Sequence, residues 1–201
     1  MFNLKFNNDK ANFLPFILTA IVVLLDQATK AFVVRHWPRP GTFITDVFGN
    51  DLLIFFHVRN PAIAFSIGYG LPQPWRTILF IIVPIMVLIV LVWYYFHTTE
   101  FTRLQRWAIA GIIGGGIGNI GDRIFRPDGV VDFISVRFFG IFGMERWPTF
   151  NIADSAVVVC CFILLFTMLK PQKSDKDQNE SQEAAPLSEA ALKETPVASN
   201  E

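Results

Sequence analysis

Four long apolar stretches constrain this chain of 201 residues more than any other feature of its sequence. A helix needs roughly 20 apolar residues to cross the hydrocarbon core of a membrane, which is about 30 Å thick. The stretches that approach this length are residues 13–34, 78–96, 107–121 and 152–169. The second contains Pro84, which a membrane helix tolerates better than a soluble one. The sequence therefore predicts an all-α integral membrane protein with four transmembrane helices. The first stretch could instead be a signal peptide, but three more stretches follow it and no A-x-A cleavage site does.

The formal net charge of zero is the sum of two opposite parts. Residues 1–172 carry a net charge of +4 and contain all 21 Phe and all five Trp, whereas residues 173–201 carry −4. We expect the first part to form the membrane domain and the second to be a disordered polar tail. A mean hydropathy of +0.42 argues against an ordinary soluble domain.

Several functional classes are excluded by residue placement. The basic residues are scattered, which argues against a nucleic-acid binder. The only cysteines, Cys160 and Cys161, are neighbours and cannot form a disulfide framework. The three histidines are too far apart in sequence to suggest a metal site. We therefore predict no metal and no other cofactor.

The long connections between the apolar stretches predict a small β-structured cap. Residues 42–45, 52–58 and 130–139 are rich in β-branched and aromatic side chains. Lys and Arg are denser in residues 1–12, 97–106 and 170–179 than in the long connections, and basic residues near span ends tend to be cytoplasmic. This places both termini in the cytoplasm and the cap on the outer side.

Ionisable residues inside membrane spans are costly and mark candidate functional sites. If the four helices alternate in direction, Asp26, Asp122 and Asp154 all fall toward the outer face. Asp132 lies in the connection on that same side, so four carboxylates share one level of the bundle. Asp122 and Arg123 could also simply mark the end of the third helix.

Simpler interpretations exist for other members of this set. Asp26 and Lys30 are spaced i, i+4 and could form an ordinary helical ion pair. Asn151 and Asp154 fit a variant of the helical capping box. Asp132 lies within an apolar β-like run and has no such local role.

The glycine-rich run at residues 111–121 allows two interpretations. It contains G-x-G-x-x-G at positions 116–121, but no strand precedes it as a dinucleotide site requires. The pairs Gly111/Gly115 and Gly114/Gly118 instead fit the small-xxx-small pattern of closely packed membrane helices.

Five sequence blocks, taken together and in order, resemble those of the bacterial signal peptidase II family, the lipoprotein signal peptidases. They are Asp26–Lys30 (D-Q-A-T-K), Asn60–Ser66 (N-P-A-I-A-F-S), Gly115–Arg123 (G-G-I-G-N-I-G-D-R), Val131–Phe133 (V-D-F) and Phe150–Asp154 (F-N-I-A-D). The resemblance covers about residues 13–170.

The resemblance implies an aspartic endopeptidase of the bacterial inner membrane, with its active site toward the periplasm. Its substrates would be prolipoproteins, cut before a diacylglyceryl-modified cysteine, and its surroundings membrane lipid. By motif position Asp132 and Asp154 would be the catalytic pair. The positions implied to shape the site or contact substrate are Asp26, Asn60, Asn119, Asp122, Arg123 and Asn151. We expect the protein to act as a monomer.

One departure and two rival hypotheses accompany this resemblance. After Asn60 the family pattern has Gly-Ala where this chain has Ala62-Ile63, which removes a glycine that could adopt φ > 0. A small transporter with charges lining an ion path, or an assembly scaffold that uses the glycine faces, would also carry polar membrane helices.

Overall fold

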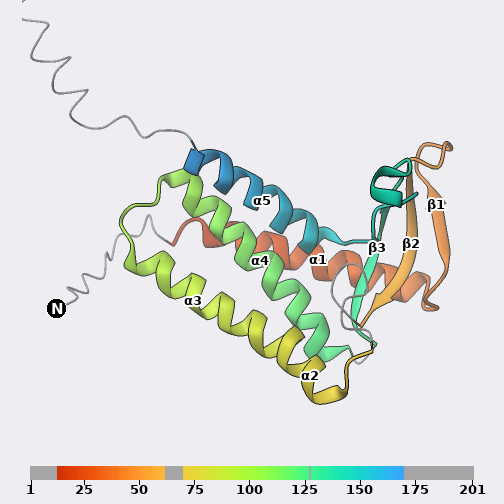
Figure 1. Ribbon diagram of the computed structural model, residues 1–201, viewed down its shortest axis with the longest axis horizontal. Helices are drawn as coiled ribbons and strands as arrows, with labels where there is room; N and C mark the ends of the chain where they lie inside the picture. The colour runs from red at the N-terminus through yellow and green to blue at the C-terminus, as the bar shows by residue number, and fades with distance from the viewer. Residues whose placement is uncertain (1–12, 62–69, 127, 170–201) are drawn as a thin grey trace, which may run out of the picture. The chain divides into compact units, whose positions relative to one another are not determined.

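Helices form over all four apolar stretches in the computed structural model (Figure 1). The structure describes residues 13–61, 70–126 and 128–169, so the predictions for the C-terminal tail and for Ala62-Ile63 lie outside the described residues. The four long helices are α1 (Phe16–His36), α3 (Val83–His97), α4 (Arg103–Phe125) and α5 (Ile152–Leu169).

Helix α3 is extended at its start by a short helix, α2 (Gln73–Thr77), and a π-helical turn, η3 (Ile78–Ile82). Pro84 lies two residues after the last residue of this turn. A proline has no N–H to donate to the carbonyl four residues earlier, and its ring crowds that carbonyl. A π turn is one way in which a helix accommodates such a disruption. The expected continuous helix through Pro84 is confirmed.

Among the described residues, three helices are long and apolar enough to cross a membrane, namely α1, Pro74–His97 and α5. Large apolar side chains on these helices are exposed, including Leu24, Val90 and Phe166. Such faces suit contact with lipid tails.

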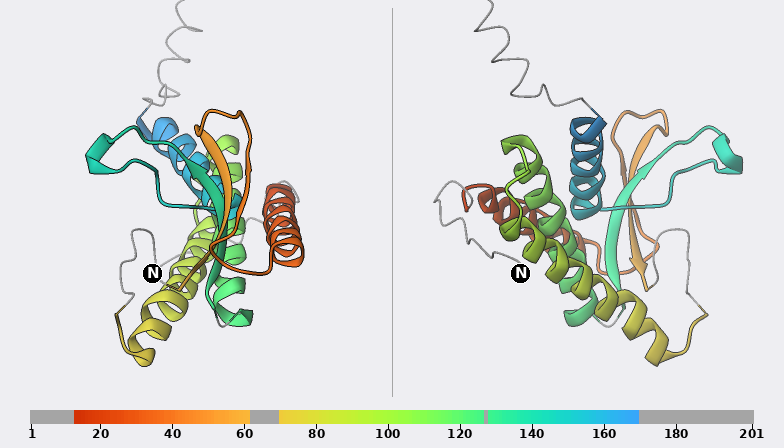
Figure 2. Two further views of the ribbon diagram at one scale, coloured as in Figure 1. Left: turned by 90° about the vertical axis from the view of Figure 1, so that its right-hand side faces the viewer. Right: turned by 60° about the vertical axis from the view of Figure 1, so that its left-hand side comes forward.

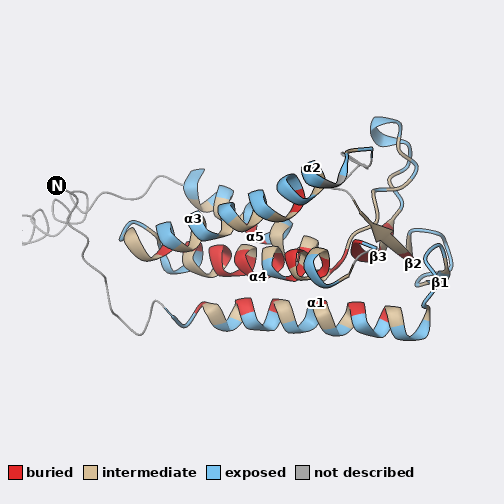
Figure 3. Cartoon of the chain, turned by 90° about the horizontal axis from the view of Figure 1, so that it is seen from below, coloured by how far each residue is buried: buried red, intermediate tan, exposed pale blue. Residues whose placement is uncertain are grey.

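Helix α4 differs from the other three long helices because it lies inside the bundle. Eleven of its 23 residues are buried, and Figure 3 shows the buried positions concentrated along α4 and on the side of α1 that faces it. The glycines and polar side chains of α4 lower its mean hydropathy, so α4 is not among the described helices that are apolar enough to cross a membrane. That α4 also crosses the membrane stays a prediction.

The glycines of α4 let two other helices approach closely. A Cβ added at Gly114 would lie 3.0 Å from Cβ of Val22 on α1. A Cβ added at Gly115 would meet the backbone carbonyl oxygen of Ala153 on α5. The run therefore serves helix packing, as the small-xxx-small pattern predicts. Because it lies within a helix rather than after a strand, the dinucleotide interpretation has no support.

Three antiparallel strands form a small sheet in the order β1-β2-β3. They are β1 (Phe43–Asp46), β2 (Leu53–Asn60) and β3 (Val130–Val136), followed by a 3-10 turn, η4 (Ile141–Gly143). The predicted β-structure is confirmed, although β3 ends earlier than residue 139. The sheet lies where α1 and α4 end and α5 begins (Figures 1 and 2). Val131 and Phe133 of β3 pack there against Val33 of α1.

We expect Gly115→Ala to destabilise the protein. The new methyl group would meet the backbone of Ala153 as well as the side chain of Val157, so α4 and α5 must separate, at a cost of about 1–3 kcal/mol. Gly121→Ala on the same helix is the matched control, because a Cβ there has nothing within 4 Å. The thermal midpoint in detergent should fall for Gly115→Ala and stay or rise for Gly121→Ala. Equal midpoints for the two variants would contradict this account of the packing.

Candidate active site

A fully buried ionic cluster joins α1 to α4. Nζ of Lys30 lies 2.8 Å from Oδ2 of Asp26 and 3.2 Å from Oδ2 of Asp122, and all three side chains are 0% exposed. Arg126 pairs with the other oxygen of Asp122. Two carboxylates thus face two cations, which meets the requirement that buried charges be compensated. The helical ion pair expected between Asp26 and Lys30 does form, but Asp122 from another helix completes it.

The same cluster also holds the backbone of β3 and α5. Oδ1 of Asp26 accepts a hydrogen bond from the backbone N–H of Ala153 at 3.0 Å. Oδ2 of Asp122 accepts one from the backbone N–H of Val131, also at 3.0 Å. The side-chain amide of Gln27 donates to Oδ1 of Asp122 at 3.0 Å. The residues next to Asp132 and Asp154 are therefore tied to the cluster.

A chain of hydrogen bonds runs from the cluster to two further aspartates. Nζ of Lys30 donates to Oδ1 of Asn119 at 2.9 Å, and Nδ2 of Asn119 donates to Oδ1 of Asp154 at 2.7 Å. Nδ2 of Asn151 donates to Oδ1 of Asn119 at 3.1 Å and to Oδ1 of Asp132 at 2.7 Å. Two asparagines thus connect Asp132 with Asp154.

Asp154 is held by the first turn of α5 as well. The backbone N–H of Asp154 donates to Oδ1 of Asn151 at 3.0 Å, and the backbone N–H of Asn151 donates to Oδ2 of Asp154 at 3.1 Å. This is the reciprocal capping arrangement expected from the sequence. Because Oδ1 of Asp154 also accepts from Asn119, the capping carboxylate belongs to the polar network too.

Asp132 lies on β3 beside the end of β2 and is 2% exposed. Nδ2 of Asn60 donates to its Oδ2 at 3.1 Å. Burial, followed by the nearby charge of Asp154, raises the pKa of Asp132 from its ordinary value to about 7, although hydrogen bonds from Asn60 and Asn151 oppose the shift. Asp132 therefore carries a proton over part of the neutral pH range.

Asp132 and Asp154 line the same pocket, which has a volume of about 360 Å³. Asn60, Asn119, Arg123 and Thr149 contribute further polar groups to its wall. Most of the remaining wall is apolar, with Val130, Trp147, Pro148, Phe150, Val157 and Val158 among its residues. Asp26, Asp122 and Asn151 do not line the pocket and instead support the residues that do.

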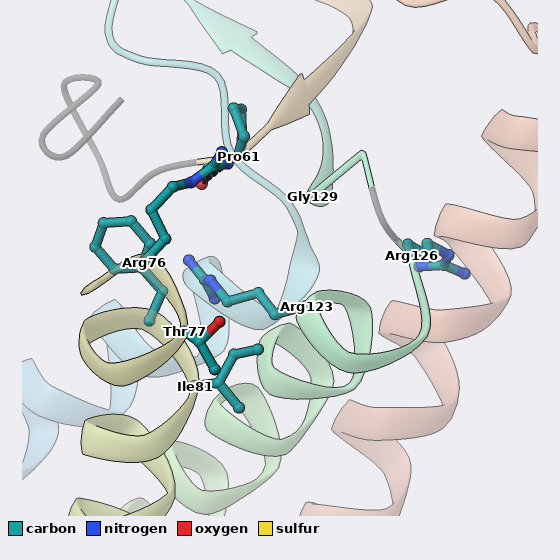
Figure 4. Close-up of a pocket in the computed structure, with 8 residues that line it drawn as sticks. Pro61, Arg76, Thr77, Ile81, Arg123, Arg126 and Gly129 are labelled. Carbon is teal, nitrogen blue, oxygen red and sulfur yellow. Dashed lines mark hydrogen bonds between the residues drawn. The ribbon is translucent and has the colours of Figure 1, made fainter. Parts of the chain in front are cut away.

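Arg123 also borders a second, smaller pocket on its other side. Figure 4 shows the guanidinium groups of Arg123 and Arg76 pointing into the same space, whereas Arg126 points away from it. Nη2 of Arg76 donates to the carbonyl of Pro61 at 3.0 Å, next to Asn60.

Sequence reasoning did not assign Arg76, Gln27 or Lys30 to the site. Arg76 lies outside the five blocks, and only the packing of α2 brings it near Arg123. Gln27 and Lys30 lie within the first block, D-Q-A-T-K. Their position beside Asp26 in this block is the sequence signal that could have assigned them to the site.

Comparisons with known proteins identify the family of this chain. The family model described as signal peptidase (SPase) II matches residues 18–170. A lipoprotein signal peptidase from Treponema pallidum (strain Nichols) is 46% identical over 169 residues, covering 84% of this chain and 90% of the relative. One from Treponema denticola is 51% identical over 154 residues, covering 77% and 87%. A solved bacterial membrane enzyme structure superposes with a TM-score of 0.66 at 26% identity, covering 80% of this chain and 93% of that one.

The family match and the apolar helices decide the class of protein. A peptidase is favoured over the transporter and scaffold hypotheses, and the exposed apolar helices place it in a membrane. The chain belongs to the signal peptidase II family of membrane-embedded peptidases.

Proposed function

We propose that this protein removes the signal peptide from prolipoproteins, cleaving before a diacylglyceryl-modified cysteine with Asp132 and Asp154 as its catalytic pair. The single observation that carries this proposal is that two aspartates from separate elements line one pocket and are joined through Asn119 and Asn151. The family match supplies the class of substrate.

Two neighbouring carboxylates can hydrolyse a peptide by sharing one proton. The ionised member takes a proton from water as the water oxygen bonds to the scissile carbonyl carbon. The neutral member donates a hydrogen bond to the carbonyl oxygen, and a proton then passes to the nitrogen as the C–N bond breaks. The raised pKa of Asp132 supports a shared proton near neutral pH. The roles of acid and base belong to the pair as a unit.

The remaining pocket residues suit a lipid-modified peptide. Asn60 and Arg123 offer N–H groups that can bind peptide carbonyls, and the apolar wall can contact acyl chains. We further propose that the protein is a monomer of the inner membrane with four spans. Both termini would be cytoplasmic, and the sheet and pocket would face the periplasm.

Asp132→Asn and Asp154→Asn should each abolish cleavage, because an amide can neither take a proton from water nor share one. Purified variants in detergent would be incubated with a diacylglyceryl-modified prolipoprotein, and the shorter product measured on a gel. Each variant should remain folded and membrane-inserted. Full cleavage by either variant would disprove the catalytic pair.

Asp26→Asn should reduce activity less than either of those substitutions. Lys30 would still pair with Asp122, and the amide oxygen could still accept from Ala153, so the loss would come mainly from reduced stability. The fraction of folded protein and the rate per folded molecule should be measured separately. Complete loss of activity in fully folded Asp26→Asn would assign Asp26 a chemical role instead.

The shared proton also predicts a pH dependence of stability. The pKa of Asp132 is about 7 in the folded protein and about 4 in an unfolded chain. Because the folded state holds the proton more tightly, protonated Asp132 stabilises the folded protein. This contribution to the free energy of unfolding is complete below a pH of about 4 and declines by about 1.4 kcal/mol per pH unit as the pH rises toward 7. The thermal midpoint of the wild type minus that of Asp132→Asn should therefore fall from pH 5 to 7 and level off above. A difference that is flat across this range would contradict the raised pKa.

A further inference from the structure

We propose that Lys30 is a positioning residue that sets the orientation of the Asn119 amide and thereby holds Asp154 for catalysis. The inference rests on the proposed role of Asp154. It gives a function to Lys30, which the proposed catalytic mechanism does not use.

The first step is the orientation of one amide group. Oδ1 of Asn119 accepts from Nζ of Lys30 at 2.9 Å and from Nδ2 of Asn151 at 3.1 Å, while its Nδ2 donates to Oδ1 of Asp154 at 2.7 Å. If the amide were flipped, its NH2 group would face two donors and its oxygen would face a carboxylate. An ammonium group can donate hydrogen bonds but cannot accept them. Only the orientation that places the oxygen of Asn119 toward Lys30 therefore allows a hydrogen bond between the two.

The second step concerns what holds Lys30 itself. Its side chain is 0% exposed and lies between two carboxylates, those of Asp26 and Asp122. A buried ammonium without compensation would be costly, but here two ion pairs and the bond to Asn119 use its three donors. The ammonium therefore has a defined position, and so does the amide it contacts.

The third step is the effect on Asp154. A hydrogen bond from a charged donor is stronger than one from a neutral donor, and chains of hydrogen bonds polarise one another. Donation by Lys30 to the oxygen of Asn119 therefore makes the NH2 group of that amide a better donor to Asp154. This favours the ionised carboxylate and fixes its direction.

Lys30 does not act by touching the substrate. It is fully buried and is not among the residues that line the pocket with Asp132 and Asp154. Its loss should consequently lower kcat while leaving KM nearly unchanged, whereas general unfolding would lower the amount of active protein and change neither constant per folded molecule.

Lys30→Met and Lys30→Gln form a matched pair for the test. Both remove the positive charge and leave Asp26 without its cation while Asp122 keeps Arg126, but only glutamine keeps an N–H that can donate to Asn119. Steady-state cleavage of a diacylglyceryl-modified prolipoprotein would be measured per folded molecule. We expect kcat to fall roughly 10- to 100-fold for Lys30→Met with KM within about twofold, and glutamine to restore most of that loss. Equal kcat for the two variants, or kcat equal to the wild type in Lys30→Met, would overturn the proposal.

A second pair of variants tests the inference if the single Lys30 variants fold poorly. In an Asp26→Asn background the substitution of Lys30 leaves Asp122 paired with Arg126, so no carboxylate of the cluster is left without a cation. Asp26→Asn/Lys30→Gln should again exceed Asp26→Asn/Lys30→Met in kcat, and equality would overturn the inference. If Asp154→Asn retained activity in the same assay, the proposed catalytic pair would be wrong. If Asp154→Asn were inactive but the Met and Gln variants of Lys30 had equal kcat, only the positioning role of Lys30 would be wrong.

Discussion

The buried ionic cluster of Asp26, Lys30 and Asp122 is the interaction on which the rest of the structure depends. Three ionised side chains with no solvent exposure are stable only while they contact one another. This requires α1 and α4 to approach closely, and a Cβ at Gly118 would lie 2.6 Å from Oδ2 of Asp26. Gly118 thus follows from the same constraint as the charges, because any side chain at that position would displace Asp26.

The cluster also connects elements that are distant in sequence. Asp26 accepts from the backbone of Ala153, which is 127 positions away, and Asp122 accepts from that of Val131. Each contact lies one residue from a proposed catalytic aspartate. A change in the spacing of α1 and α4 would therefore shift the backbone next to both Asp132 and Asp154.

The site combines strict hydrogen bonding with limited solvation. Both oxygens of Asp132 and both oxygens of Asp154 accept hydrogen bonds from Asn60, Asn119 or Asn151. Their orientation is therefore set before any substrate binds. Burial raises the pKa of Asp132 at the same time. In the proposed function the partly apolar pocket would both favour a shared proton and contact acyl chains.

Much of the fold could be predicted from the sequence, because it depends on local patterns. Long apolar runs predicted the four helices, alternating β-branched residues predicted the strands, and the spacing of Asn151 and Asp154 predicted a cap. The five ordered blocks also indicated the family. The helices, the strands and the cap are each encoded within a window of about 20 residues, where periodicity and turn residues are informative.

The contacts between elements were decided only by the tertiary structure. The pattern of Asp26 and Lys30 predicted an ion pair, but not that Asp122 would share the ammonium or that Asn119 would carry the contact on to Asp154. Arg76 reaches the space beside Arg123 only through the packing of α2. The sequence alone thus predicted which residues would carry the chemistry and determined on which elements they lie. Packing determined which of them touch, because a hydrogen bond needs atoms within about 3 Å and only the close approach of glycine-lined helices brings these side chains that near.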